Sequence, residues 1–342
     1  MKKILTAIIF VFCCSILVYS ADKAAAEKYF NSGNDKAKAG DYKGAVRDYT
    51  KAIKLDPKYT YAYAGRGVAE NAAGDYINAT NDLSRAIELS PDYAYAYNNR
   101  GLSEANLNQF DNAVQDYNTA ITLDPKFIEA YKNRGHAEYQ QKKYSEAEKD
   151  YDTAIMLDKN NKLLYCDRGN AEIELGDFEA AIKDFTKVIE IDPMYAYAYN
   201  NRGVAKNKLG QYNDAIKDYN RSIELNPKNK LAYTNRAKVK DDLGDKKAAA
   251  DDYTKAIELD PSDVLVYASR AAARFDMDDY KGAIEDYTKV IAIDPKATGA
   301  YYNRGLAKNK LGDKQGAIDD LDKAGAMGDQ DAIDKSKELS GK

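Results

Sequence analysis

The stretch AYAYNNRGVAKNKLGQYNDAIKDYNRSIELNPKN, residues 196–229, carries the pattern that decides the fold. Apolar residues in its second half recur at intervals of three and four, which is typical of an amphipathic helix. Gly210 lies between the halves, where a glycine in the left-handed conformation can end the first helix. Pro227 lacks a backbone donor and restricts Asn226, so the second helix has to stop there. The stretch therefore predicts a helical hairpin.

The same pattern recurs every 34 residues along the chain. With residue 196 as position 1, all seven prolines occupy position 32, position 4 is Tyr in nine units, and position 20 is Ala in nine. The nine units cover residues 26–59, 60–93, 94–127, 128–161, 162–195, 196–229, 230–263, 264–297 and 298–331. A hairpin of this size cannot bury its apolar face alone, whereas stacked neighbours can. We therefore expect a solenoid.

These positions resemble the tetratricopeptide repeat family over 306 of the 342 residues. The matching features are a large aromatic residue at position 4, small residues at positions 8 and 20, an aromatic residue or Leu at position 24, and Pro at position 32. The resemblance implies an all-α, right-handed α-solenoid of nine helix-turn-helix repeats. Residues 21–25 would lead into the first repeat, and residues 332–342 would form a C-terminal capping helix.

Residues 1–20 have the composition of a cleaved signal peptide, with Lys2 and Lys3 before an apolar run. This predicts export to the periplasm or secretion from a bacterial cell. An uncleaved leader that anchors the chain to the inner membrane is one alternative. Lipid attachment at Cys13 or Cys14 is another, which the bulky residues before them disfavour. Cleavage would leave Cys166 as the one cysteine, so no intrachain disulfide is expected.

Composition and residue usage argue against several classes of function. The chain has 51 Lys and Arg against 55 Asp and Glu, so no basic excess attracts nucleic acid. One His and one mature Cys are too few for a metal site, and the glycines follow the repeat instead of forming a phosphate loop. We expect no cofactor, no metal, no small-molecule substrate and no catalytic residues. The enzyme alternative is a thiol and imidazole pair formed by Cys166 and His136.

Asparagine recurs at position 6, one of the positions (2, 5, 6, 9, 12 and 13) that face the ligand in the family's concave groove. The six residues are Asn31, Asn99, Asn133, Asn201, Asn235 and Asn303. An amide both donates and accepts hydrogen bonds, so such a ladder can bind the backbone of an extended peptide. It is similar to the asparagine ladder in the repeats of O-linked N-acetylglucosamine transferase. The alternatives are local hydrogen bonding and persistence from repeat duplication.

Other groove positions add aromatic and polar groups to this predicted peptide-binding surface. Position 2 contributes Tyr61, Tyr95 and Tyr197, and position 5 contributes Asn98, Asn200 and Lys132. The octapeptides 93–100 and 195–202 are identical, so duplication of a three-unit block is an alternative explanation. The carboxylate clamp of co-chaperones requires further cations after a Lys at position 5. The units after Lys132 lack them, so a chaperone-tail reader is not expected.

Arg at position 7 in eight units and Asp at position 23 in nine form a second recurrent pair. We expect a contact between the two helices of each repeat, because paired charges tolerate partial burial, and not a basic ladder for an anionic ligand. Together the patterns predict a non-enzymatic protein-interaction scaffold that holds an extended peptide or a partner surface in its groove. The alternative is a structural or assembly component of an envelope complex that uses its convex face.

Overall fold

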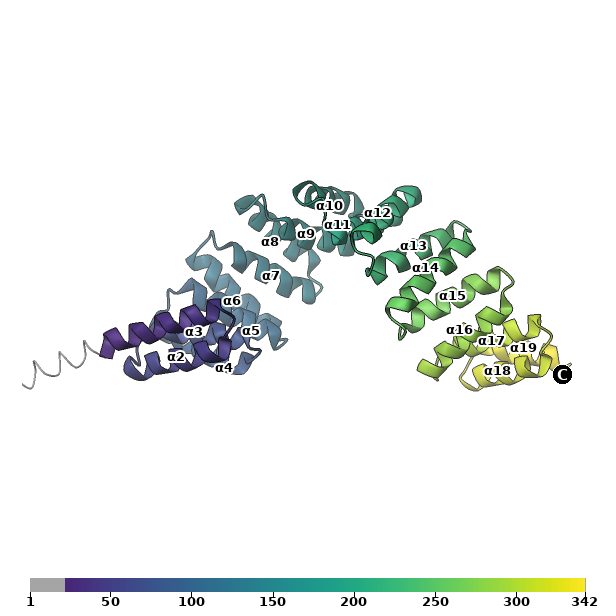
Figure 1. Cartoon of the computed structure of the whole chain (residues 1–342), viewed down its shortest axis with the longest axis horizontal. Helices are drawn as coiled ribbons and strands as arrows, with labels where there is room; N and C mark the ends of the chain where they lie inside the picture. The colour runs from purple at the N-terminus through teal and green to yellow at the C-terminus, as the bar shows by residue number, and fades with distance from the viewer. Residues whose placement is uncertain (1–21, 342) are drawn as a thin grey trace, which may run out of the picture. The chain divides into compact units, whose positions relative to one another are not determined.

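The computed structural model of the chain describes residues 22–341, in which every regular element is a helix. The predicted leader and residue 21 lie outside the described residues. A helix that includes residues 22–38 is followed by α2 to α19 (Figure 1). These elements confirm an all-α helical repeat solenoid. No helix of residues 22–341 combines the length and apolar character needed to cross a bilayer.

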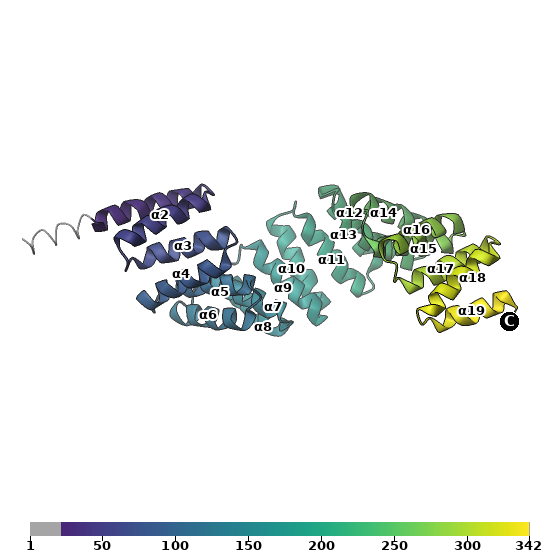
Figure 2. The ribbon, with the colours of Figure 1, turned by 90° about the horizontal axis from the view of Figure 1, so that it is seen from below.

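The chain divides into two compact units, of which unit 1 ends at Leu175 and unit 2 begins at Gly176. Within each unit, each helix packs beside the next along the chain (Figures 1 and 2). Unit 1 contains α2 (Tyr42–Leu55), α3 (Thr60–Ala72), α4 (Tyr76–Leu89), α5 (Ala94–Asn106), α6 (Phe110–Leu123), α7 (Ile128–Gln140), α8 (Tyr144–Leu157) and α9 (Lys162–Leu175). Unit 2 contains α10 (Phe178–Ile191), α11 (Ala196–Lys208), α12 (Tyr212–Leu225), α13 (Lys230–Asp242), α14 (Lys246–Leu259), α15 (Val264–Asp276), α16 (Tyr280–Ile293), α17 (Thr298–Lys310), α18 (Lys314–Ala326) and α19 (Gln330–Ser340).

The turn inside each repeat follows the predicted chemistry. Gly74 has φ +83°, and the next residue, Asp75, accepts a hydrogen bond from the backbone N–H of Asn78 at the start of α4. Three repeats have no glycine at this position. Their residues Asn108, Lys142 and Asp278 nevertheless take φ values of 60°, 61° and 60°. The left-handed turn is therefore imposed by the repeat, at a conformational cost where the residue is not glycine.

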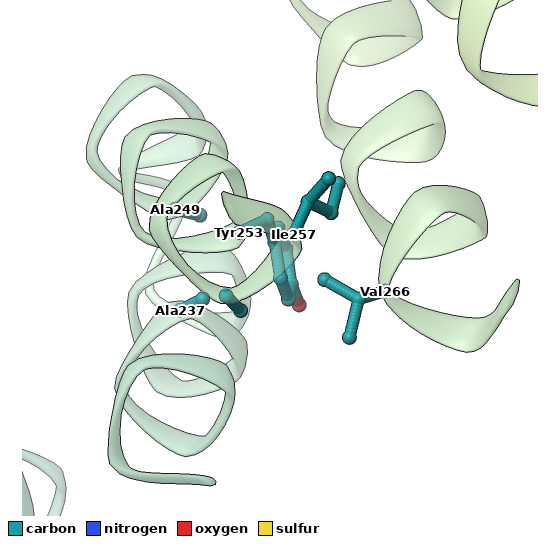
Figure 3. Close-up of a cluster of buried hydrophobic side chains, with 6 residues drawn as sticks. Ala237, Ala249, Tyr253, Ile257 and Val266 are labelled. Atoms are coloured by element: carbon teal, nitrogen blue, oxygen red, sulfur yellow. The ribbon is translucent and has the colours of Figure 1, made fainter. Parts of the chain in front are cut away.

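Small residues allow the two helices of a repeat to approach closely. A Cβ atom added at Gly101 would lie 2.8 Å from Cε1 of Tyr117, which is fully buried. Figure 3 shows the equivalent packing in unit 2, where Tyr253 of α14 lies among Ala237, Ala249 and Val266. Because α13, α14 and α15 all contribute to this cluster, each core is shared between one repeat and the next.

The C-terminal helix begins before the segment that we predicted. It starts at Gln330 and not at residue 332, because Asp329 caps it by accepting a 3.0 Å hydrogen bond from the N–H of Ala332. Asp329 occupies position 32, where most other repeats have Pro. Ala332 is buried against Leu321 and Ala324 of α18, so α19 covers an apolar face of the last repeat.

Candidate interaction surface

The recurrent Arg and Asp residues form buried pairs, which confirms the predicted contact between helices. In α11, Arg202 donates from Nε and Nη2 to the carboxylate of Asp218 on α12, at 2.9 and 2.7 Å. Its Nη1 donates to Thr186 on α10, in the preceding repeat, at 3.1 Å. The equivalent pairs are Arg66–Asp82, Arg100–Asp116, Arg134–Asp150, Arg236–Asp252, Arg270–Asp286 and Arg304–Asp320.

Each of these arginines therefore links the two helices of its own repeat and also bonds to the second helix of the preceding repeat. The ring of the Tyr at position 4 lies against the guanidinium, as in Arg202 over Tyr199 at 5.5 Å. The Arg202 side chain is 16% exposed. The arginines thus act as structural staples, which agrees with the interpretation that we preferred to an anion-binding ladder.

The asparagine ladder is largely engaged within the protein. Asn99 is 7% exposed and donates to the carbonyl of Tyr95 on its own helix at 2.8 Å. Asn133 donates to Oδ1 of Asn98 at 3.0 Å, and Asn235 donates to Oδ1 of Asn200 at 3.2 Å. Local hydrogen bonding, the alternative raised from the sequence, therefore describes Asn99, whereas Asn133 and Asn235 bond to the preceding repeat.

The remaining predicted polar residues differ in exposure. Asn98 and Asn200, which we placed on the ligand-facing surface, are buried, and Asn200 also donates to Oδ1 of Asn201 at 2.8 Å. Asn31 is exposed. Asn201, Asn303 and Lys132 are half-buried. A ligand would therefore find fewer exposed asparagine side chains than the sequence pattern indicates. The role of the asparagine ladder in binding stays a prediction.

Position 2 is apolar and exposed in six repeats. We expected Tyr61, Tyr95 and Tyr197 here and overlooked three leucines at the same position, a signal that the repeat alignment already contained. The exposed fractions are 57% for Tyr61, 42% for Tyr95 and 48% for Leu163 in unit 1, and 41% for Tyr197, 56% for Leu231 and 78% for Leu265 in unit 2. We call these residues the position-2 stripe of each unit.

An open cavity of about 350 Å³ lies in unit 1 between the helix over 22–38, α3 and α5. Aromatic rings dominate its lining. The rings of Tyr61 and Tyr93 meet edge-on with centroids 5.4 Å apart, and Tyr93 and Tyr95 lie 5.8 Å apart. Burial raises the pKa of Tyr93 to about 12, so this hydroxyl is neutral at physiological pH. We call this cavity the Gly65 pocket, after the glycine in its wall.

The residues of the enzyme alternative lie in different surroundings. Cys166 is 3% exposed, so its thiol has little access to a substrate in solution. The half-exposed His136 lies in a second cavity of about 190 Å³, and its Nε2 is 2.9 Å from Oδ2 of Asp167. Among residues 22–341, no group of three or more His, Cys, Asp or Glu is arranged to hold a metal ion.

The side chain at position 11 is a cation throughout unit 2 and mostly Glu in unit 1, a difference that we did not predict from the sequence. In unit 2 it is a cation that pairs with the Asp at position 23, as in Lys206–Asp218 and Lys240–Asp252, both at 2.8 Å. In unit 1 it is Glu from the second repeat onward. Residues Glu70, Glu104 and Glu138 each have a buried Oε2 atom without a hydrogen-bond partner in the described part of the chain.

These glutamates are poorly solvated carboxyls beside other acids. Burial, followed by the nearby Asp116, raises the pKa of Glu104 to about 7. The same causes raise the pKa of Glu70 to about 8 and that of Glu138 to about 7, with Asp82 and Asp150 as the respective neighbours. Their ionisation therefore opposes folding of unit 1.

Comparison with known families supports the repeat assignment. The sequence matches the Tetratricopeptide repeat family at residues 94–127, 128–161, 196–229 and 231–263, and the TPR repeat family at 33–70, 169–210 and 271–312. The chain belongs to the tetratricopeptide repeat (TPR) family. No curated protein sequence matches the chain significantly.

Solved structures show the same fold. A tetratricopeptide repeat protein from Parabacteroides merdae is 20% identical, with a TM-score of 0.55 over 73% of this chain and 99% of that one. Cut9-Hcn1 of the APC/C is 18% identical, with a TM-score of 0.54 over 81% of this chain and 54% of that one. PilF of Pseudomonas aeruginosa is 18% identical, with a TM-score of 0.54 over 60% and 94%. At these identities the likeness concerns the fold alone.

Proposed function

We propose that this TPR protein is a non-enzymatic scaffold that binds an extended peptide, or an extended part of a partner's surface, along the first helices of its repeats. The observation that carries the proposal is the position-2 stripe. In unit 2, Tyr197, Leu231 and Leu265 present apolar side chains from the first helices of three consecutive repeats. Apolar groups that recur on one face of a soluble protein are typical of an interaction site.

The stripe residues of unit 2 recur once in each repeat, as contacts of a ligand that lies across the repeats would. The first helices of neighbouring repeats contact one another in several places, as α3 does with α5 and α11 with α13, so a segment that crosses the repeats can reach position 2 of both. A bound segment would bury these side chains together, and Tyr in particular supplies contact area at small entropic cost. The half-buried Asn201, Asn235 and Asn303 would add polar contacts in the same unit.

Substitution of the stripe tests this proposal against the convex-face alternative. Cell extract is passed over the wild type, over a Tyr197→Ser, Leu231→Ser and Leu265→Ser triple variant, and over a control that carries Lys187→Glu, Lys217→Glu and Lys255→Glu on the second helices. All six side chains are at least 41% exposed, so the variants are expected to fold. Specific loss of partners in the stripe variant supports the groove. Loss only in the lysine variant favours assembly through the convex face.

We further propose that the protein is exported, in the periplasm or secreted, after cleavage of residues 1–20. The apolar run behind Lys2 and Lys3 supports this proposal. Mass spectrometry of the protein from its natural host measures the mature N-terminus directly. A chain that begins at Ala21 supports export with cleavage, whereas an intact leader in the membrane fraction supports the anchored alternative.

A further inference from the structure

We infer that the Gly65 pocket binds an aromatic side chain of the peptide, flanked by acidic residues. This inference rests on the proposed function and names the chemistry of the ligand at one repeat. Gly65 occupies position 6, which is Asn in six other repeats. The asparagine ladder is thus interrupted at the place where the larger of the two groove cavities described above opens.

The pocket differs from its counterpart two repeats later in this wall and in other lining residues: Leu102, Asn106 and His136 take the places of Asn34, Lys38 and Val68 there. There, Asn133 occupies position 6, and the cavity measures about 190 Å³ against about 350 Å³ at Gly65. Only the larger value lies within the range of roughly 300–1,000 Å³ that is typical of ligand pockets. A Cβ atom at Gly65 would lie 2.9 Å from Cε1 and Cζ of Tyr49, so the close approach of that ring requires glycine.

The lining favours a ring over an aliphatic chain. Tyr61, Tyr93 and Tyr95 line the cavity as neighbouring rings, and Phe30 of the helix over 22–38 lines it as well. Aromatic rings gain energy in edge-to-face and offset contacts beyond the area that they bury. Tyr61 and Tyr95 are also exposed members of the position-2 stripe, so the pocket is continuous with the proposed binding surface.

The charge of the pocket favours particular residues on either side of the aromatic residue in the bound peptide. Lys38 is the one charged side chain among the lining residues, and no carboxylate lines the cavity. Asn34, one turn earlier, accepts a 2.7 Å hydrogen bond from the Tyr49 hydroxyl through Oδ1, which fixes its amide with the nitrogen as the remaining donor. A cation in the pocket would be repelled by Lys38, whereas a neighbouring carboxylate would be attracted by Lys38 and Asn34.

Synthetic probes test this chemistry with the full chain. The probe is fluorescein-labelled Gly-Ser-Asp-Phe-Asp-Ser-Gly, and its binding is measured by fluorescence anisotropy. Matched probes replace Phe by Ala, Phe by Lys, or both Asp by Lys. We expect saturable binding of the parent probe and at least about tenfold weaker binding of each matched probe, since one buried ring or one flanking charge pair contributes on this scale.

Protein variants locate the binding. Gly65→Asn fills the pocket with the residue that six other repeats carry, and Tyr61→Ser removes a ring that is 57% exposed and needed little for folding. Each is expected to weaken the parent probe about tenfold. Lys38→Glu should weaken the parent probe and strengthen the probe with Lys in place of Asp. Tyr197→Ser, at the same position in unit 2, is the control and should leave the affinity unchanged.

The outcomes separate this inference from the proposed function. The inference is overturned if the parent probe does not bind, or if it binds Tyr61→Ser and Gly65→Asn as tightly as the wild type. If the inference fails in this way while the stripe variant of unit 2 still loses its partners, the groove stands as the interaction site. If neither the probes nor the stripe variant shows an effect, both proposals fall.

Discussion

The buried glutamates of unit 1 make its stability depend on pH, and Glu104→Lys is the sharpest test. The pKa of Glu104 rises from the ordinary 4.5 to about 7 in the folded chain, because burial and Asp116 disfavour its ionised form despite the nearby Arg100. Between these two pH values the folded state binds more protons than the unfolded state. The contribution of Glu104 to the free energy of unfolding therefore falls as pH rises from 4.5 to about 7 and changes little above that range.

The size of the effect follows from the same two values. A rise from 4.5 to about 7 corresponds to about 3 kcal/mol of stability present at pH 4.5 and absent at pH 8. The side chain is 9% exposed, so screening by water removes only a part of it. In unit 2, a Lys at the equivalent position 11 pairs with the Asp at position 23, as Lys206 does with Asp218 at 2.8 Å. Glu104→Lys is therefore expected to raise stability by about 2–3 kcal/mol at pH 8.

Urea unfolding followed by circular dichroism measures this prediction at pH 5 and pH 8. The control is Glu129→Lys, which makes the same charge change at an exposed position on α7. We expect Glu104→Lys to shrink the difference in unfolding free energy between the two pH values, and Glu129→Lys to preserve it. A Glu104→Lys variant that shifts the urea midpoint equally at both pH values would show that ionisation of this buried carboxyl does not govern stability.

Two further predictions concern the repeat framework. Arg202→Ala removes two hydrogen bonds to the buried Asp218 and leaves Lys206 as its partner, so it should lower stability by about 2 kcal/mol in urea unfolding and leave ligand affinity unchanged. Unchanged stability with weaker ligand binding would assign the arginines to the binding site. Lys142→Gly relieves a φ of 61° and should raise stability by up to about 1 kcal/mol, whereas Gly74→Lys should lower it by about that amount, since no atom lies within 4 Å of an added Cβ there. A lower melting temperature for Lys142→Gly, or an unchanged or higher one for Gly74→Lys, would contradict the strain argument.

The repeat phase explains why most of the fold was accessible from the sequence. Glycine in the turn and proline after the second helix act locally, so their recurrence predicted the hairpins directly. At two positions, the repeat pattern is kept although the usual glycine or proline is absent. Lys142 adopts a glycine conformation because the repeat imposes it, and Asp329 caps α19 in a position where most repeats have proline.

The candidate site was less accessible because exposure depends on neighbours in other repeats. The sequence placed Asn133 at a ligand-facing position but could not show that its amide nitrogen is held by Asn98. The change from Glu to Lys at position 11 is visible in the sequence, yet its consequence depends on burial. Leu231 and Leu265 also occupy position 2 in the sequence, but we predicted a binding role only for the tyrosines at this position.

Site-specific photo-crosslinking tests the central proposal most directly. A benzoylphenylalanine side chain is placed at Leu231 of the position-2 stripe in one variant and at Lys217 on the second helix α12 in another. Both sites are well exposed within the same unit. The account predicts that irradiation in the natural host joins a partner polypeptide to the Leu231 variant and not to the Lys217 variant. A partner joined only through position 217 would contradict it.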